Sequence, residues 1–172
     1  PIKVDLSLDD SRALSQLIPI SGGTLTTTAP DGTTYTLEIP ADALLNDTEI
    51  TMTPIQVSEM PVGIEPGPGV QLEPNGLNLF NFATLTITPV QEIPIDQQIF
   101  FGSEADGKNL SLALPEIESS DMKINLLHFS DYFVGTGNLE NIAYVLPRLG
   151  GAVTAELTNK VAELTTRERE RQ

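Results

Sequence analysis

Short runs of β-branched residues, separated by turns rich in glycine and proline, recur along most of this chain. The first clear pair, residues 24–28 and 34–39, is rich in threonine and flanks Ala29-Pro30-Asp31-Gly32, where proline presets a turn and glycine accepts a positive φ. Further strands are predicted at residues 49–55, 70–72, 77–80, 83–88, 99–102, 110–114 and 123–134. Strands at a spacing of about ten residues, with almost no helical periodicity between them, predict an all-β fold, an antiparallel β-sandwich or barrel.

The N-terminal residues follow a less regular pattern. Val4, Leu6 and Leu8 alternate with polar residues, which indicates an initial strand. A second extended stretch is expected to run through Ile18. We therefore predict that residues 1–20 are an N-terminal strand extension of the sandwich.

The C-terminal residues differ from the rest of the chain. After the predicted sandwich at residues 21–135, residues 136–172 are expected to form a linker and an amphipathic C-terminal α-helix from about residue 152 to residue 169. Apolar residues at steps of three and four carry this prediction: Leu149, Val153, Leu157, Val161 and Leu164. Such a helix either packs on the sandwich or leads to another domain.

The charge of the chain excludes several classes of partner. Asp and Glu number 24 against 9 Lys and Arg, so the net charge is −15. This field repels phosphate groups, which argues against nucleic acids and anionic membranes. No apolar run approaches the length of about 20 residues that a membrane span needs, so no direct membrane insertion is predicted. With no cysteine and one histidine, we predict no metal and no cofactor.

Five segments resemble the motifs of ZU5 domains and occur in that family's order. They are GGTL at 22–25, the "IP-x-x-AL" motif within 37–44, VQLEPNGL at 70–77, ATLTI at 83–87 and HFSDY at 128–132. Together they span about two-thirds of the chain. The resemblance implies a β-sandwich that serves as an interaction or structural module and not as an enzyme.

The chain departs from the animal members of that family. It has no tryptophan, and Phe82-Ala83 stands where a proline is common before the central strand. Its composition is closer to the prokaryotic relatives, which occur in large exported proteins. We therefore expect a module of a larger exported or surface protein, extracellular or at the cell surface, that binds an unknown protein partner or a neighbouring domain. The chain begins at Pro1 without a signal-peptide pattern, as expected for a fragment or a mature form.

The tripeptide His128-Phe129-Ser130 suggests an alternative function. In some death-domain relatives of the family, a similar tripeptide is the site of autoproteolysis between Phe and Ser. Here Ser130 would attack the carbonyl carbon of Phe129, with His128 as the base, and water would hydrolyse the resulting ester. A regular strand does not aim Ser130 at that carbonyl, so this chemistry needs a kink; the structural alternative is that His128 and Ser130 hydrogen-bond to a neighbouring loop.

Other sites find less support in the sequence. The turns at 104–107 and 31–32 lack the alternating Asp and Asn ligands of a calcium loop. A triad of His128, Ser130 and an aspartate would lack a nucleophile elbow. A carbohydrate-binding sandwich would need two or more exposed aromatic side chains on one sheet face, and the chain has no Trp and only three Tyr.

Overall fold

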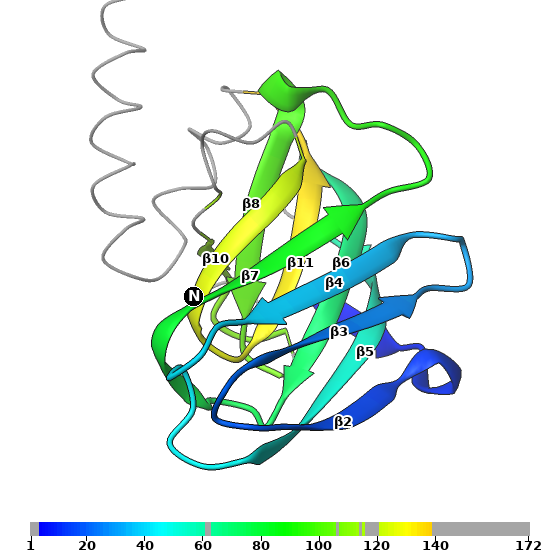
Figure 1. The fold of residues 1–172 in the computed structure, drawn as a ribbon. Helices are drawn as coiled ribbons and strands as arrows, with labels where there is room; N and C mark the ends of the chain where they lie inside the picture. Colours follow the sequence, from blue (N-terminus) through cyan, green and yellow to red (C-terminus); the bar gives the residue numbers. More distant parts are fainter. Residues whose placement is uncertain (1–3, 61–62, 106, 114, 116–120, 139–172) are drawn as a thin grey trace, which may run out of the picture.

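The computed structural model describes residues 4–60, 63–105, 107–113, 115 and 121–138. These residues form two antiparallel sheets joined by short connections (Figure 1). The strands are β1 (Asp5–Leu8), β2 (Leu14–Ile18), β3 (Gly23–Thr28), β4 (Thr34–Ile39), β5 (Thr48–Glu59), β6 (Glu65–Glu73), β7 (Asn78–Thr88), β8 (Gln98–Ser103), β9 (Ser111–Leu112), β10 (Met122–His128) and β11 (Asp131–Thr136). The all-β, antiparallel prediction is confirmed, whereas the predicted C-terminal helix lies outside the described residues.

The larger sheet has seven strands in the order β1-β5-β6-β11-β8-β9, with β2 also paired to β5. β5 is long enough to hold two partners on one edge. β2 pairs with its first half, with Ile18 opposite Thr48, and β1 pairs with its second half, with Leu8 opposite Ile55. The 3-10 helix η1 (Asp10–Arg12) joins them. The strands predicted within residues 1–20 are thus part of this sheet.

The smaller sheet has four strands in the order β10-β7-β4-β3. The predicted hairpin is confirmed as β3 and β4, with Thr26 opposite Thr36 and their hydroxyl oxygens 3.2 Å apart. Threonine alternates with apolar residues along most of three strands, so these threonines face outward while the apolar side chains face the other sheet. Thr27 is the exception in β3, since it is buried and donates a hydrogen bond to the Arg12 carbonyl. Leu37 and Leu85 are fully buried on that inner face, directly opposite each other.

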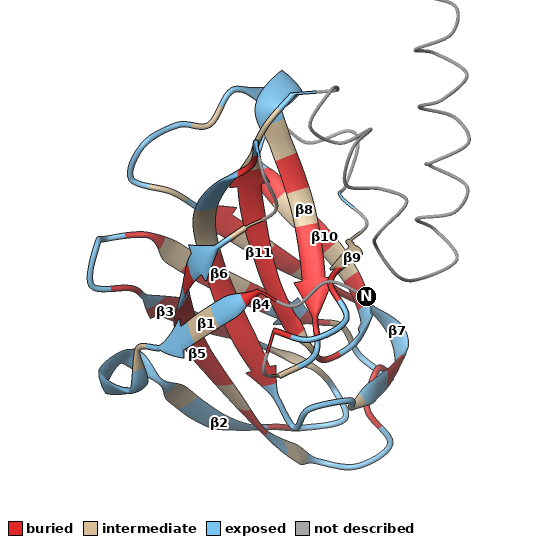
Figure 2. Ribbon diagram, turned by 180° about the vertical axis from the view of Figure 1, so that it is seen from behind, coloured by how far each residue is buried: buried red, intermediate tan, exposed pale blue. Residues whose placement is uncertain are grey.

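The main core lies between the two sheets and draws residues from both. Leu25 and Ile124 extend the inner row of the smaller sheet, and Met52 and Leu72 face them from the larger sheet. Leu44, at the end of the "IP-x-x-AL" motif, is buried in this core. The arrangement is sandwich-like, and β11, in the middle of the larger sheet, is buried along nearly its whole length (Figure 2).

A second apolar cluster covers the outer face of the larger sheet. Phe101 and Phe133 stack there with ring centroids 5.6 Å apart, and Val4 from the N-terminal segment closes over them. Gly69 lies opposite both Ile55 and Phe133, and a Cβ atom at residue 69 would come within 2.5 Å of the Phe133 Cβ. The absence of a side chain at Gly69 therefore makes room for the aromatic stack.

Two strand predictions were wrong in their boundaries. Residues 77–80 and 83–88 were predicted as separate strands, but they belong to the single strand β7, which continues through Phe82. Residues 123–134 were predicted as one closing strand, but they form β10 in the smaller sheet and β11 in the larger one. The chain changes sheets at residues 129–130, because Phe129 turns into the core there.

Candidate functional site

The change of sheet at Phe129 and Ser130 is held by backbone hydrogen bonds from a distant part of the chain. The Phe129 amide donates to the Leu77 carbonyl (2.9 Å), and the Phe129 carbonyl accepts from the Gly76 amide (2.9 Å). The next carbonyl, that of Ser130, accepts from the Leu72 amide (3.1 Å). The backbone N–H and C=O of Phe129 are therefore both hydrogen-bonded to the segment 76–77. We call residues 128–130 the corner.

One of these donors comes from the turn Pro74-Asn75-Gly76, which lies within the motif at 70–77. Gly76 has a φ of +77°, a conformation that side-chain-bearing residues rarely adopt, and this brings its amide toward the Phe129 carbonyl. The turn therefore supports the corner directly.

Tyr132 closes the corner from the outgoing strand. Its hydroxyl donates a 2.6 Å hydrogen bond to the His128 carbonyl oxygen, and its ring meets the His128 ring edge to face, with centroids 6.3 Å apart. Burial raises the pKa of Tyr132 to about 12, while the side chain of Ser130 acts in the opposite direction. The tyrosine thus stays neutral and remains a donor over the ordinary pH range.

The three residues singled out in the sequence are exposed to different degrees. His128 is exposed at the end of β10, Phe129 is fully buried, and Ser130 is half-buried. The predicted alternation placed Phe129 on the same face as Leu127, yet Leu127 is exposed. The extended run is interrupted here, since one strand ends at His128 and the next begins at Asp131.

Asp131 does not join His128 and Ser130 in a triad. It is fully buried, and alternation along β11 places it on the sheet face opposite to Tyr132. It stands in a row of buried polar residues across the larger sheet, between Gln71 of β6 and Ser103 of β8. This row packs under the turn after β8, where the Gln71 amide donates to the Ala105 carbonyl (3.1 Å).

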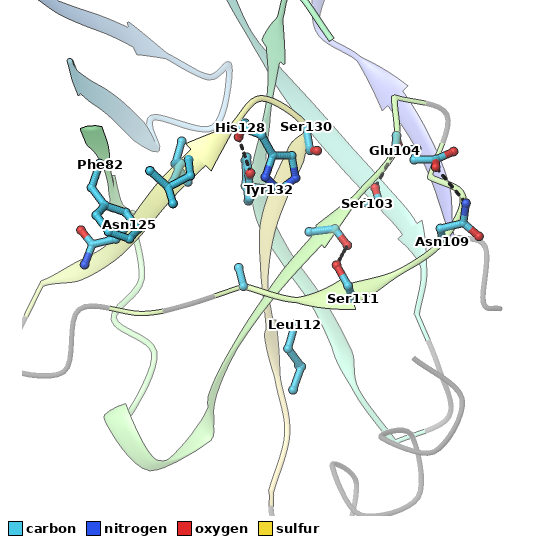
Figure 3. Close-up of a pocket in the computed structure, with 14 residues that line it drawn as sticks. Phe82, Ser103, Glu104, Asn109, Ser111, Leu112, Asn125, His128, Ser130 and Tyr132 are labelled. Carbon is cyan, nitrogen blue, oxygen red and sulfur yellow. Dashed lines mark hydrogen bonds between the residues drawn. The ribbon is translucent and has the colours of Figure 1, made fainter. Parts of the chain in front are cut away.

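A groove of about 470 Å³ opens beside the corner, between the last strand of each sheet, β9 and β10 (Figure 3). Figure 3 shows Phe82 and Asn125 on one side of it, Glu104 and Asn109 on the other, and the corner at its head. The described residues that line it are Phe82, Gly102, Ser103, Glu104, Asn109, Ser111, Leu112, Ala113, Asn125, Leu126, Leu127, His128, Ser130 and Tyr132. Its volume lies within the range of small-molecule and cofactor sites.

The polar groups of the groove are mostly uncharged. Glu104 is the one carboxylate among the described lining residues, and it accepts a hydrogen bond from the Asn109 amide (2.9 Å). The hydroxyl of Ser111 donates to the Gly102 carbonyl (3.3 Å). On the opposite wall, Thr84 donates to the side-chain oxygen of Asn125 (3.4 Å). Hydroxyl and amide groups therefore line the groove together with apolar residues such as Ala113 and Leu127.

Phe82 is the exposed aromatic residue of this site, and the sequence reasoning did not single it out. Half of its side chain is exposed, and Phe80 on the same strand is 65% exposed. Phe82 also lines a second hollow of about 320 Å³, together with Thr24, Glu38 and Thr84 on the outer face of the smaller sheet. The sequence pattern that could have indicated it is the alternation Phe80-Asn81-Phe82, which comes just before the alternating threonines of residues 84–88.

Two other kinds of feature, a metal site and a membrane-spanning helix, were sought among the described residues. No group of three or more His, Cys, Asp or Glu side chains in the described ranges could hold a metal ion. Within the same ranges, no helix is long and apolar enough to span a membrane. No protein-family model matches the chain, and the curated proteins compared with it include none that matches.

Proposed function

We propose that the chain is a non-enzymatic binding module, built on a ZU5-like β-sandwich, within a larger exported or surface protein. The observation that carries this proposal is the groove between β9 and β10. It combines exposed apolar side chains, notably Phe82 and Leu127, with hydrogen-bonding groups on rigid strands. Exposed apolar surface rimmed by polar groups is typical of binding sites.

The polar side chains on the strands that flank the groove are held in place by hydrogen bonds, which favours binding of a ligand over catalysis. β9 ends one sheet and β10 ends the other, so the groove lies between two sheet edges. Its walls hold Ser111, Asn125 and Glu104, each of which takes part in a hydrogen bond within the protein. Such fixed polar groups suit recognition of a ligand's shape and polarity.

The proposal is tested by a substitution in the groove and a matched one elsewhere. Leu127→Arg places a charged side chain at an exposed groove position, and Leu17→Arg makes the same change at an exposed position of β2. We expect ligands found on a glycan array or in a random peptide library to lose binding to Leu127→Arg and to keep it with Leu17→Arg. Equal binding by both variants, or no ligand in either collection, contradicts the proposal.

A second candidate function, self-cleavage at the corner, is favoured by one specific observation. The Phe129 carbonyl already accepts a hydrogen bond from the Gly76 amide, a donor placed where negative charge would develop on that oxygen. In this reaction, the Ser130 hydroxyl oxygen bonds to the Phe129 carbonyl carbon while His128 takes the hydroxyl proton. The carbon–nitrogen bond then breaks, the Ser130 nitrogen receives the proton, and water hydrolyses the ester.

Intact mass under denaturing conditions tests self-cleavage. Fragments of residues 1–129 and 130–172, present in the wild type and absent in Ser130→Ala, are the expected result if the reaction occurs. A single full-length mass after long incubation rejects self-cleavage and leaves the binding module unaffected.

A further inference from the structure

We infer that the groove beside the corner binds a neutral oligosaccharide, with the Phe82 ring as the surface on which a sugar ring lies. This inference rests on the proposed function, because it names the ligand class of the same groove. Three observations carry it: the exposed aromatic ring, the uncharged hydrogen-bonding groups around it, and the charge of the chain.

The first observation is the position of Phe82. Its side chain is half exposed and follows the strand next to buried Ala83, at the part of β7 where the pairing with β10 is irregular. Phe82 is the residue shared by the two hollows, of about 470 Å³ and 320 Å³, so a chain-like ligand that runs from one to the other crosses its ring. A sugar ring has an apolar face of C–H groups, which can pack on an aromatic ring.

The second observation is the kind of polar group around the ring. The hydroxyls of Ser111 and Thr84 donate to Gly102 and Asn125, and their oxygens can still accept hydrogen bonds from sugar hydroxyls. The side-chain amide of Asn125 can donate to a sugar oxygen. Because bonds within the protein hold these groups in place, they can distinguish one hydroxyl arrangement from another. A ligand with many hydroxyl groups can pair with them, whereas an apolar ligand cannot.

The third observation is electrostatic. The chain carries a net charge of −15, so it repels anionic ligands. Within the groove, the Glu104 carboxylate already accepts a hydrogen bond from Asn109, and the described lining contains no Lys or Arg. An anionic glycan would meet repulsion without a basic partner in the described lining, and a cationic peptide would find one carboxylate in each hollow, Glu104 and Glu38. An uncharged, hydroxyl-rich ligand fits this lining best.

The test compares the wild type with two substitutions of Phe82 on an array of neutral and anionic oligosaccharides, beside the random peptide library. We expect binding to neutral oligosaccharides and none to anionic ones. Phe82→Leu keeps an apolar side chain but removes the ring, and we expect it to weaken binding about tenfold or more. Phe82→Trp keeps an aromatic surface and is expected to retain binding, which also shows that the position tolerates substitution.

Three other binding results would overturn all or part of this inference. Binding of peptides that Leu127→Arg abolishes, with no oligosaccharide bound, overturns the sugar assignment and leaves the binding module in place. Oligosaccharide binding that survives Phe82→Leu unchanged also overturns the role of the ring. No binding on either collection overturns both the ligand class and the proposed function.

Discussion

The hydroxyl of Tyr132 donates a 2.6 Å hydrogen bond to the backbone carbonyl of His128, four residues earlier in the chain. This bond joins the strand that leaves the corner to the strand that enters it, and so links the two sheets. Tyr132→Phe leaves that carbonyl without this donor. We expect it to lower the free energy of unfolding by about 1–2 kcal/mol in urea titrations. Thr28→Val, at an exposed position of β3, is the control and should change stability by less than about 0.5 kcal/mol.

Stability should fall in alkaline solution. Burial raises the pKa of Tyr132 from 10.0 to about 12, so the folded protein holds this proton more tightly than the unfolded chain does. This tighter binding of the proton stabilises the folded state fully below pH 10. The stabilisation is lost as the pH rises from 10 toward 12, and the free energy of unfolding then falls by about 2–3 kcal/mol in all. Tyr132→Phe should make this decline shallower without abolishing it, because burial also raises the pKa of Tyr35. Urea titrations at pH 9, 10 and 11 measure it, and parallel declines for both proteins would contradict the assignment.

Filling the space at Gly69 should be costly. A Cβ atom there would lie 2.5 Å from the Phe133 Cβ and 3.0 Å from a side-chain carbon of Ile55. We expect Gly69→Ala to destabilise the fold by about 1–3 kcal/mol through overpacking. Gly102→Ala is the matched control, since the nearest atom to its Cβ would be at an ordinary 3.4 Å. Similar melting temperatures for the two variants would show that the stack of Phe101 and Phe133 tolerates a shift.

The corner depends on the burial of Phe129. We expect Phe129→Ala to cost about 3–5 kcal/mol, because a fully buried ring is removed from the main core. Leu127→Ala, two residues earlier and 43% exposed, should cost far less. Denaturant titrations of the two variants compare them directly. Equal losses would support the regular strand that alternation predicted, in which residues 127 and 129 share one face.

Much of the fold could be predicted because its signals are local. Pro30 and Gly32 define the hairpin between β3 and β4, and the threonines beside them favour an exposed sheet face. The same logic located β5, β8 and the second half of β6, but it missed the first residues of β6, Glu65-Pro66-Gly67-Pro68-Gly69. Each of these segments has its turn residues next to it in the sequence, so a window of about ten residues contains the necessary information.

The corner could not be predicted because its determinants are distant in sequence. Alternation of apolar residues changes phase at Leu126-Leu127 within residues 123–134, but a change of phase does not show that the chain passes to the other sheet. The hydrogen bonds that fix Phe129 come from Gly76 and Leu77, about fifty residues earlier. Hydrophobic periodicity describes faces of a strand and not the sheet to which the strand belongs.

The candidate site was predicted only in part, for a related reason. His128 and Ser130 were singled out from a motif, and both line the groove. Phe82 and Ser111 were not, because the groove forms where the edges of two sheets meet, and no local pattern reports that meeting. The exposure of Phe80 and Phe82 satisfies the aromatic requirement set for a carbohydrate-binding sandwich.

Binding in the groove is the central claim, and amide chemical shifts of the ¹⁵N-labelled protein test it most directly. The protein is titrated with a pool of neutral oligosaccharides and, separately, with a pool of peptides. We predict that the oligosaccharides shift the amides of Phe82, Ser111 and Asn125, while those of Leu17 and Thr48 on the far edge of the larger sheet stay unchanged. If neither pool moves the groove amides, or if the shifts gather on the β2–β5 edge instead, the account is contradicted.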